Sequence, residues 1–342
     1  MKLSVVIPVH NGGSDLRRCL EALMRSARRP DEVIVVDDAS SDGSAELAAR
    51  FGFVISNQRR EPFGPARARN LGAARSQGDI VLFLDADVMV HANTLALIER
   101  CFAEHPETAA MFGSYDDQPP HRSLVSLYKN LQHHFVHHHS QGDASTFWTG
   151  VGAIRREIFL RLGGFDESYG QPSIEDIELG VRLKEAGYRI RLCPDVQVTH
   201  LKRWTLLSML RTDIFNRAIP WTRLIFSTAH LPGDLNLDWK SRASAVCVWG
   251  MLILSIFGLW IFPAWAGVFA LVAFVIAANF PLYRFFFQRG GIGFAAGAVL
   301  LHFLYYFYSS LTFGLVSIEH LLTRKHQKRR LSYGSIESNH GT

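Results

Sequence analysis

The first two hundred residues alternate short apolar runs with stretches in which apolar residues recur at helical spacing. Apolar, β-branched runs predict buried strands at residues 3–8, 32–38, 53–56, 79–85 and 189–193. Helical spacing predicts helices at residues 16–24, 45–50, 66–74, 94–102, 124–139 and 177–186. Strands that alternate with helices are typical of a mostly parallel, twisted sheet covered by helices on both faces. We therefore predict an α/β fold for this part of the chain.

A different pattern begins near residue 243. Residues 243–283 and 290–318 contain no Asp, Glu, Lys or Arg. As a helix, the first run would be about 60 Å long at ~1.5 Å per residue, enough to cross a hydrocarbon core of about 30 Å twice. Pro263 lies near its middle, where a hairpin would turn. The second run predicts either a third crossing or a bent, re-entrant segment, and a purely soluble protein is excluded.

Residues 201–240 interleave large apolar residues with arginines. This pattern indicates amphipathic helices lying on a membrane surface, and the alternative is a helix packed on the soluble domain. We expect four parts in the chain: an α/β domain at residues 1–200, interfacial helices at 201–240, two to three transmembrane helices at 241–320, and a basic, disordered tail at 321–342.

Basic residues flank the apolar segments, within residues 240–242, 284–289 and 324–330. Lys and Arg favour the cytoplasmic side of a membrane. We therefore expect a multi-pass protein of the inner (plasma) membrane whose N-terminal α/β domain is cytoplasmic. Two crossings keep the first two basic clusters on that side, whereas a full third crossing would place the last one outside. The sequence leaves this conflict open.

The charge and the cysteine content limit which binding partners and which cellular setting we expect for this protein. The net charge is +5 at pH 7, but the basic residues crowd the membrane segments, which favours anionic lipid head groups over nucleic acid. The four cysteines are far apart and form no CxxC pair, so a disulfide framework and a zinc ribbon are not expected and a reduced, cytoplasmic setting is. The N-terminal apolar run stops at Pro8, unlike that of a signal peptide.

Polar residues follow three of the predicted strands: His10 the first, Asp38 the second, and Asp85 with Asp87 the fourth. In parallel α/β sheets, ligands bind at the carboxyl ends of the strands. Two carboxylates at alternate positions could hold a divalent metal with a diphosphate, and Asp38 could accept hydrogen bonds from a base or a ribose. Alternatively, Asp85 and Asp87 are solvated acids of a loop, and Asp38 caps a helix or lies in a turn.

Five histidines gather at residues 133, 134 and 137–139. On a helix, two of their pairs are four residues apart and could bind zinc. Since no acid or cysteine lies close by in the sequence, the favoured interpretation is a helix near the mouth of a site or near the membrane surface.

Six motifs occur in an order and spacing that resemble the family 2 glycosyltransferases of the GT-A fold. They are VVIPVHN at residues 5–11, VVDDASSDGS at 35–44, ARNLG at 68–72, GDIVLFLDAD at 78–87, GGFDE at 163–167 and EDIELG at 175–180. The resemblance covers about residues 3–204. It implies a nucleotide-diphospho-sugar transferase domain that moves a sugar from a nucleotide-activated donor with inversion at the anomeric carbon.

The resemblance also implies roles for individual residues. Pro8 and His10 would line the nucleotide cleft, and Asp38 would contact the base, usually uracil. Arg69 would lie near the donor diphosphate or sugar. Asp85 would lie near the ribose and donor sugar, and Asp87 would bind a divalent metal, Mn²⁺ or Mg²⁺.

By the same resemblance, Asp176 stands at the position of the family's general base. A base on the face of the sugar opposite the leaving group would remove the proton of an acceptor hydroxyl. The neighbouring Glu175 and Glu178 could raise the pKa of Asp176. The alternative is that Glu175 and Asp176 only cap the helix that follows.

The segment HLKRW at residues 200–204 resembles the QxxRW element of membrane-embedded polysaccharide synthases, with His in place of Gln. By this resemblance His200 would add a metal ligand, Arg203 would pair with a phosphate and Trp204 would stack on an acceptor. The His in place of Gln, and the few apolar segments, favour transfer of single sugars over processive polymer synthesis.

These features predict an inverting glycosyltransferase that uses a nucleotide sugar, expected to be a UDP-sugar. The acceptor would be a hydroxyl of a lipid-linked sugar or glycolipid precursor at the cytoplasmic membrane face. The alternatives are a polyprenyl-phosphate sugar synthase, whose ionised acceptor needs no base, and a small processive polysaccharide synthase. A degenerate membrane scaffold that only binds nucleotide sugars is disfavoured, since Asp38, Asp85, Asp87 and Asp176 are all present.

Overall fold

A computed structural model describes residues 1–57, 59, 61–140, 142–228 and 238–337, with residues 324–337 described for the backbone alone. The N-terminal part contains eight strands: β1 (Leu3–Val9), β2 (Glu32–Asp37), β3 (Phe53–Ser56), β4 (Ile80–Leu84), β5 (Val88–Val90), β6 (Thr108–Tyr115), β7 (Val151–Arg155) and β8 (Arg189–His200). Its helices are α1 (Gly13–Met24), α2 (Ser44–Ala48), α3 (Pro65–Arg75), α4 (Thr94–Glu104), α5 (Leu124–His139), α6 (Arg156–Arg161) and α7 (Glu175–Glu185).

All eight strands belong to one mixed sheet in the order β3-β2-β1-β4-β7-β6-β8-β5. The half built from β3, β2, β1 and β4 is parallel throughout. Antiparallel pairing begins at β7, which lies between β4 and β6, and returns at the edge, where β5 pairs with β8. The prediction of an α/β sheet is therefore confirmed, with more antiparallel pairing than the alternation of strands and helices indicates.

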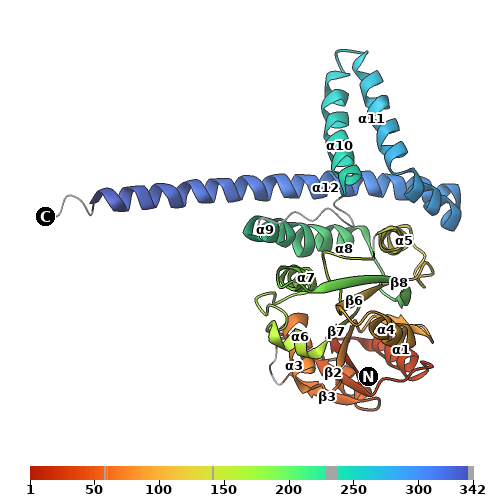
Figure 1. Cartoon of the computed structure of the whole chain (residues 1–342). Coiled ribbons are helices and arrows are strands. Elements are labelled where there is room, and N and C mark those ends of the chain that lie inside the picture. Colours follow the sequence, from red (N-terminus) through yellow and green to blue (C-terminus); the bar gives the residue numbers. More distant parts are fainter. Residues whose placement is uncertain (58, 60, 141, 229–237, 338–342) are drawn as a thin grey trace.

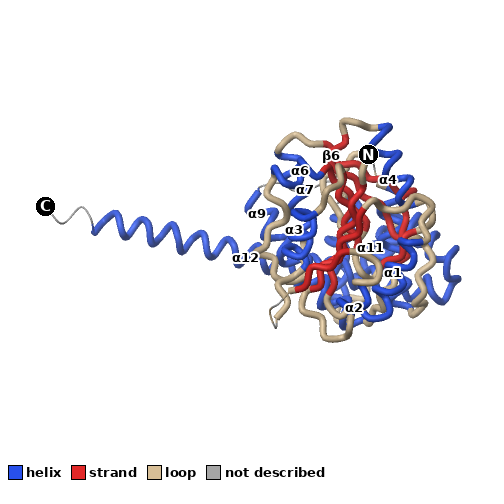
Figure 2. The backbone as a smooth tube through the Cα atoms, turned by 90° about the horizontal axis from the view of Figure 1, so that it is seen from below, coloured by secondary structure: helices blue, strands red, loops and turns tan. Residues whose placement is uncertain are grey.

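Two apolar cores lie on the two faces of this sheet. Along β1, Val5 and Ile7 face one core while Val6 faces the other, and β4 divides in the same way. This alternation explains why these strands are apolar at nearly every position, because both faces are covered. Figure 2 shows the strands between α1 and α4 on one side and α3, α6 and α7 on the other.

Three strands, β5, β6 and β7, were not predicted. β6 reads TAAMFGSY and β7 reads VGAIR, so Ala and Gly occupy positions that β-branched residues fill in β1 and β2. β5 has three residues. Their pairing depends on neighbours far away in the sequence, and a local pattern therefore does not reveal them.

The C-terminal part is helical. A segment formed by α8 (Leu206–Arg211), the π-helix η1 (Thr212–Ala218) and α9 (Ile219–Thr228) follows β8, and α10 (Trp239–Phe257), α11 (Ala264–Ala278) and α12 (Phe280–Glu337) complete the chain. The α10–α11 hairpin turns just before Ala264, at the expected proline. Figure 1 shows α8 and α9 between the sheet domain and α12, and α12 passing across the base of the hairpin.

Two described helical segments have the length and composition to cross a membrane: Trp239–Phe257 and Phe280–Thr323. The helix Ala264–Ala278 is apolar but shorter. Gly291 interrupts α12 with a φ of 73°, a conformation that glycine adopts at little cost. Beyond residue 321, where the sequence predicts a disordered tail, the backbone continues as helix to Glu337, because Lys, Gln and Arg favour helix and no Gly or Pro occurs there before Gly334. Residues 338–342 lie outside the described residues.

The bulge in β6 gives a test of the sheet. The register between β6 and β8 shifts between Phe112 and Ser114, and a Cβ at Gly113 would lie 1.9 Å from the carbonyl oxygen of Val196. Gly113→Ala should therefore lower the free energy of unfolding by about 1–3 kcal/mol, measured by thermal or denaturant unfolding. Gly142→Ala is the matched control, since the nearest atom to its added Cβ lies 3.9 Å away. Equal stability of the two variants would contradict the assigned register.

Candidate active site

The carboxyl ends of β1, β2 and β4 open into a cavity of about 540 Å³. Because these strands are parallel neighbours, the residues that follow them meet at one edge of the sheet. Six of the predicted site residues line this cavity: Pro8, His10, Asp38, Arg69, Asp85 and Asp87. Residues up to 79 positions apart in the chain are thus brought to one hollow with an acidic wall.

Asp38 is almost fully buried and organises the rim of the cavity. Its carboxylate accepts hydrogen bonds from the side chain of Asn57 and from the backbone N–H groups of Phe63 and Gly64, at 2.8–2.9 Å. The ring of His10 hydrogen-bonds the backbone carbonyl of Asp38 at 2.7 Å. The expected contact between Asp38 and a base remains a prediction, but the residue holds Asn57, Phe63 and Gly64 in place beside the cavity.

Arg69 is buried and joins two acids from distant parts of the chain. Its Nη2 donates to Asp85 and its Nη1 to Glu175, each at 2.8 Å. Only 5% of the side chain of Glu175 is exposed, so these carboxylates have a cation as partner where an unpaired charge would be costly. Burial raises the pKa of Asp85, and the neighbouring guanidinium opposes this shift. The arginine therefore ties the end of β4 to the start of α7.

Asp87 and His200 face each other across the edge of the cavity. Asp87 Oδ2 lies 3.7 Å from His200 Nε2. The pairing of Val88 in β5 with His200 in β8 sets this approach, and the N–H of Leu201 donates to the carbonyl of Asp87 at 2.8 Å. Burial would raise the pKa of Asp87, but His200 and Lys202 outweigh it and hold that pKa below its ordinary value.

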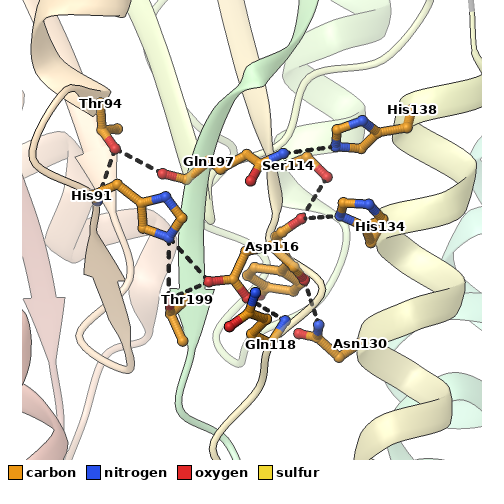
Figure 3. Close-up of polar contacts among 11 residues, drawn as sticks. His91, Thr94, Ser114, Asp116, Gln118, Asn130, His134, His138, Gln197 and Thr199 are labelled. Carbon is orange, nitrogen blue, oxygen red and sulfur yellow. Dashed lines mark hydrogen bonds and ion pairs between the residues drawn. The ribbon is translucent and has the colours of Figure 1, made fainter. Parts of the chain in front are cut away.

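A polar network behind this pair holds β5, β6 and β8 together. His91 Nε2 lies 3.0 Å from Asp116 Oδ2, and the Thr199 hydroxyl donates to the same carboxylate oxygen. Thr94 donates to the carbonyl of Gln197 at 2.7 Å. Figure 3 shows these side chains converging from three strands and the following loops. Because Thr199 directly precedes His200, the network fixes the backbone that presents the histidine.

The Asp87–His200 pair fits a divalent cation. Ligand atoms that each lie ~2.1 Å from one ion can be at most ~4.2 Å apart, and the observed separation is 3.7 Å. Among the described residues no group of three His, Cys, Asp or Glu side chains could hold a metal. Two protein ligands leave positions for water and substrate phosphates, as is usual for Mg²⁺ sites.

Asp176 lies in the first turn of α7, directly after Glu175, but does not line the cavity itself. Its Oδ2 accepts from the backbone N–H and the hydroxyl of Thr149, both at 3.1 Å. Burial and the charge of Glu175 raise the pKa of Asp176 to about 6. The carboxyl is thus held in one orientation close to the Arg69 bridge, with a pKa suited to proton exchange near neutrality.

The structure does not bring Arg203 and Trp204 into the cavity. Trp204 is 6% exposed and packs in an apolar cluster with Leu127, Phe286 and other residues of α5 and α12. The backbone N–H of Trp204 donates to the hydroxyl of Ser126 at 2.8 Å. A buried indole has no free face for a sugar, so the stacking role expected for Trp204 is corrected to a packing role. Arg203 is exposed outside the cavity.

The histidine cluster belongs to the packing of α5. His134 and His137 hydrogen-bond the carbonyls of Tyr115 and Gly113 at the end of β6, at 2.8 and 2.9 Å. Burial lowers the pKa of His137 to about 4, which keeps the ring neutral. These two rings satisfy backbone carbonyls of β6, a role that the sequence pattern does not predict.

Sequence reasoning missed other parts of the site. Lys202 lines the cavity, and the HLKRW segment could have identified it because it lies two residues after His200. Gly170, Gln171 and Pro172 also line it. A Cβ on Gly64 would lie 2.5 Å from the carbonyl oxygen of Gly170, so two loops meet closely there. No local pattern signals that contact.

Family models match most of the N-terminal part. Residues 4–163 match the model described as glycosyl transferase family 2. Residues 129–204 match a second model, described as the N-terminal domain of galactosyltransferase. Together these matches extend from β1 to the end of the HLKRW segment and contain every residue singled out above as a site residue.

Curated relatives are glycosyltransferases. The chain is 26% identical over 247 residues to the O-antigen chain rhamnosyltransferase RfbN of Salmonella typhimurium, a match that covers 67% of this chain and 77% of that protein. It is 31% identical over 224 residues to the pre-mycofactocin glycosyltransferase of Mycobacterium tuberculosis, covering 62% of this chain and 45% of that protein. The match to the second relative thus spans less than half of its length.

Among solved structures, the chain is similar to the mannosyltransferase PcManGT from Pyrobaculum calidifontis, whose structure holds GDP-Man and Mn²⁺. The TM-score is 0.57 with 21% sequence identity, over 87% of this chain and 86% of that one. At this identity the similarity concerns the fold. The family match, the relatives and the fold agree with the order of motifs, and the chain belongs to the family 2 glycosyltransferases of the GT-A fold and is a glycosyltransferase.

Proposed function

We propose that this enzyme transfers one sugar from a nucleotide sugar to a hydroxyl group of a lipid-linked sugar or glycolipid, with inversion, at the cytoplasmic face of the inner membrane. The observation that carries the proposal is the single cavity that Asp38, Asp85 and Asp87 share, with Arg69 joining its acidic wall to the helix of Asp176. The family habit favours a UDP-sugar as donor.

The cavity has the chemistry that a nucleotide diphosphate requires. Asp38, Pro62 and Gly64 border one end, where the base would bind. Asp87 and His200 would hold Mn²⁺ or Mg²⁺ at the other end. The positively charged side chain of Lys202 also lines the cavity. When bound, the metal acts as a Lewis acid that stabilises the charge developing on the leaving diphosphate.

The acceptor hydroxyl oxygen attacks the anomeric carbon as the bond from that carbon to the diphosphate oxygen breaks. The nucleoside diphosphate leaves with the bonding electron pair, and the hydroxyl proton passes to Asp176. Thr149 holds one oxygen of this carboxylate, and the N–H of Ile177 donates to the other at 2.8 Å. A base held on the side opposite the leaving group requires inversion.

The C-terminal half of the chain supports the proposal that the acceptor is a lipid. The α10–α11 hairpin exposes large apolar side chains, with Leu259, Trp260 and Phe262 more than 70% exposed. Contiguous apolar surface of this kind favours lipid contact, and the basic flanks favour the cytoplasmic side. Because α12 passes across the base of the hairpin (Figure 1), we propose that the third apolar segment bends at the membrane surface, which keeps all basic clusters on one side.

Replacement of the proposed base is the first test. Asp176→Asn should lower turnover at least about 10²-fold, because general base catalysis typically contributes that much. Donor binding should survive, since Asp176 does not line the cavity. Initial rates at saturating donor and a donor-binding isotherm measure the two quantities. Unchanged turnover would favour a phosphate acceptor, which is already ionised, and would contradict the proposal.

The pH dependence of turnover follows from the same residue. With the pKa of Asp176 at about 6, the carboxyl is protonated at lower pH and cannot accept the hydroxyl proton. Turnover should therefore fall about tenfold per unit below pH 6 and level off above it. In Asp176→Asn the residual rate should lose this inflection. An identical inflection in both proteins would assign it to another group.

Metal dependence is tested by donor binding. With Mn²⁺ present, a genuine nucleotide sugar at 100 times its Kd should stabilise the protein by about 2.7 kcal/mol, read as a thermal shift across a panel of nucleotide sugars. Chelation of the metal, and the variants Asp87→Asn and His200→Ala, should weaken this stabilisation at the same donor concentration. Full stabilisation in the chelated protein would contradict the assignment of Asp87 and His200 as ligands.

A further inference from the structure

A buried carboxylate connects the apolar helix α12 to the catalytic part. Asp213, on η1, accepts hydrogen bonds from Lys129 Nζ of α5 at 2.9 and 3.0 Å and from the Tyr308 hydroxyl of α12 at 2.5 Å. The exposed fractions of the Asp213 and Lys129 side chains are 5% and 11%. Arg217, one turn further along η1, adds a contact at 3.5 Å. One side chain thus holds three elements together.

The helix that carries Asp213 is irregular. Residues Thr212–Ala218 form a π-helix between α8 and α9. Such turns are rare and frequently occur at functional sites. The buried ion pair is weak evidence for stability, because its desolvation can cost as much as the attraction returns. The positioning of η1 therefore explains the presence of this ion pair better than a contribution to stability does.

From η1, hydrogen bonds lead to the active site. The Ser173 hydroxyl donates to the carbonyl of Asn216 on η1 at 2.9 Å, and the N–H of Ser173 donates to Glu175 Oε2 at 2.9 Å. The other oxygen of Glu175 binds Arg69, which in turn binds Asp85. Each link is a direct contact, and the path runs from the apolar helix to the donor cavity.

The same path contains part of the cavity wall. Gly170, Gln171 and Pro172 line the cavity and directly precede Ser173. A shift of η1 would therefore move Ser173 and, with it, both the wall segment and the start of α7. Coupling of this kind needs a contiguous set of contacts whose arrangement both ends influence.

We propose that Asp213 is a positioning residue: bound between Lys129 and Tyr308, it fixes η1 and thereby the 170–176 segment, so that the placement of α12 sets the geometry of the donor site. This inference rests on the proposed function for its kinetic consequence. Its structural consequence, a coupling between α12 and residues 170–176, stands apart from the identity of the substrates.

Two mild variants interrupt the path at opposite ends. Tyr308→Phe removes one hydroxyl from the Asp213 site, and Ser173→Ala removes the bond to η1. Each should lower kcat/KM for the donor by about 2-fold to 30-fold, the range found for coupling along such networks, and the double variant should lose less than the product of the two. Arg223→Ala is the matched control, because it breaks an exposed contact between α9 and α12, the Arg223–Glu319 pair, and should leave kcat/KM unchanged.

Hydrogen exchange separates this inference from the proposed function. Amide exchange across residues 170–176 should accelerate in Tyr308→Phe and Ser173→Ala and remain at the wild-type rate in Arg223→Ala, whichever sugar the enzyme uses. A lowered Tm with unchanged exchange and unchanged kcat/KM in both variants would reduce the network to a structural role and overturn the proposal. If exchange accelerates but no nucleotide sugar is used by the wild-type protein, the proposed function fails while the coupling holds.

Discussion

The site depends on one buried cation, the guanidinium of Arg69. An arginine removed from water needs anionic partners, and here the partners come from the end of β4 and the start of α7. The two acids are 90 residues apart in the chain, and the folded sheet with its helices brings both to the same guanidinium. Because the guanidinium is planar, it also fixes the two carboxylates in a shared geometry. The acidic wall of the cavity and the helix that carries Asp176 are therefore held as one unit.

The sheet supplies the second constraint. Parallel β1, β2 and β4 bring His10, Asp38 and Asp85 to one edge, and the antiparallel pair β5–β8 brings Asp87 opposite His200. The polar network around Asp116 then holds β8 where its last residue is needed (Figure 3). Parallel pairing thus places the residues of one half of the cavity, and antiparallel pairing places those of the other half.

Much of the cavity could be predicted because its residues follow strands that are buried on both faces. Such strands are apolar without interruption, and the polar residue that ends each one is conspicuous. Asp38, Asp85 and Asp87 were recognised in this way and by their resemblance to family motifs. The contacts of Asp213 with Lys129 and Tyr308 could not be predicted from the sequence. These partners are 84 and 95 positions from Asp213, and all three residues lie in segments whose local pattern indicates only amphipathic or apolar helix. Trp204 was misassigned for a related reason, since its burial is decided by α5 and α12 and not by its neighbours in the sequence.

The account requires that the leaving diphosphate and Asp176 act from opposite sides of the same sugar. The most direct test is the anomeric configuration of the first product, read from proton coupling constants by NMR during the initial turnovers with a donor of known configuration. The account predicts inversion, so that an α-linked donor gives a β-linked product. Retention of configuration would contradict it, because a retained product cannot come from a single displacement assisted by a base on the far side.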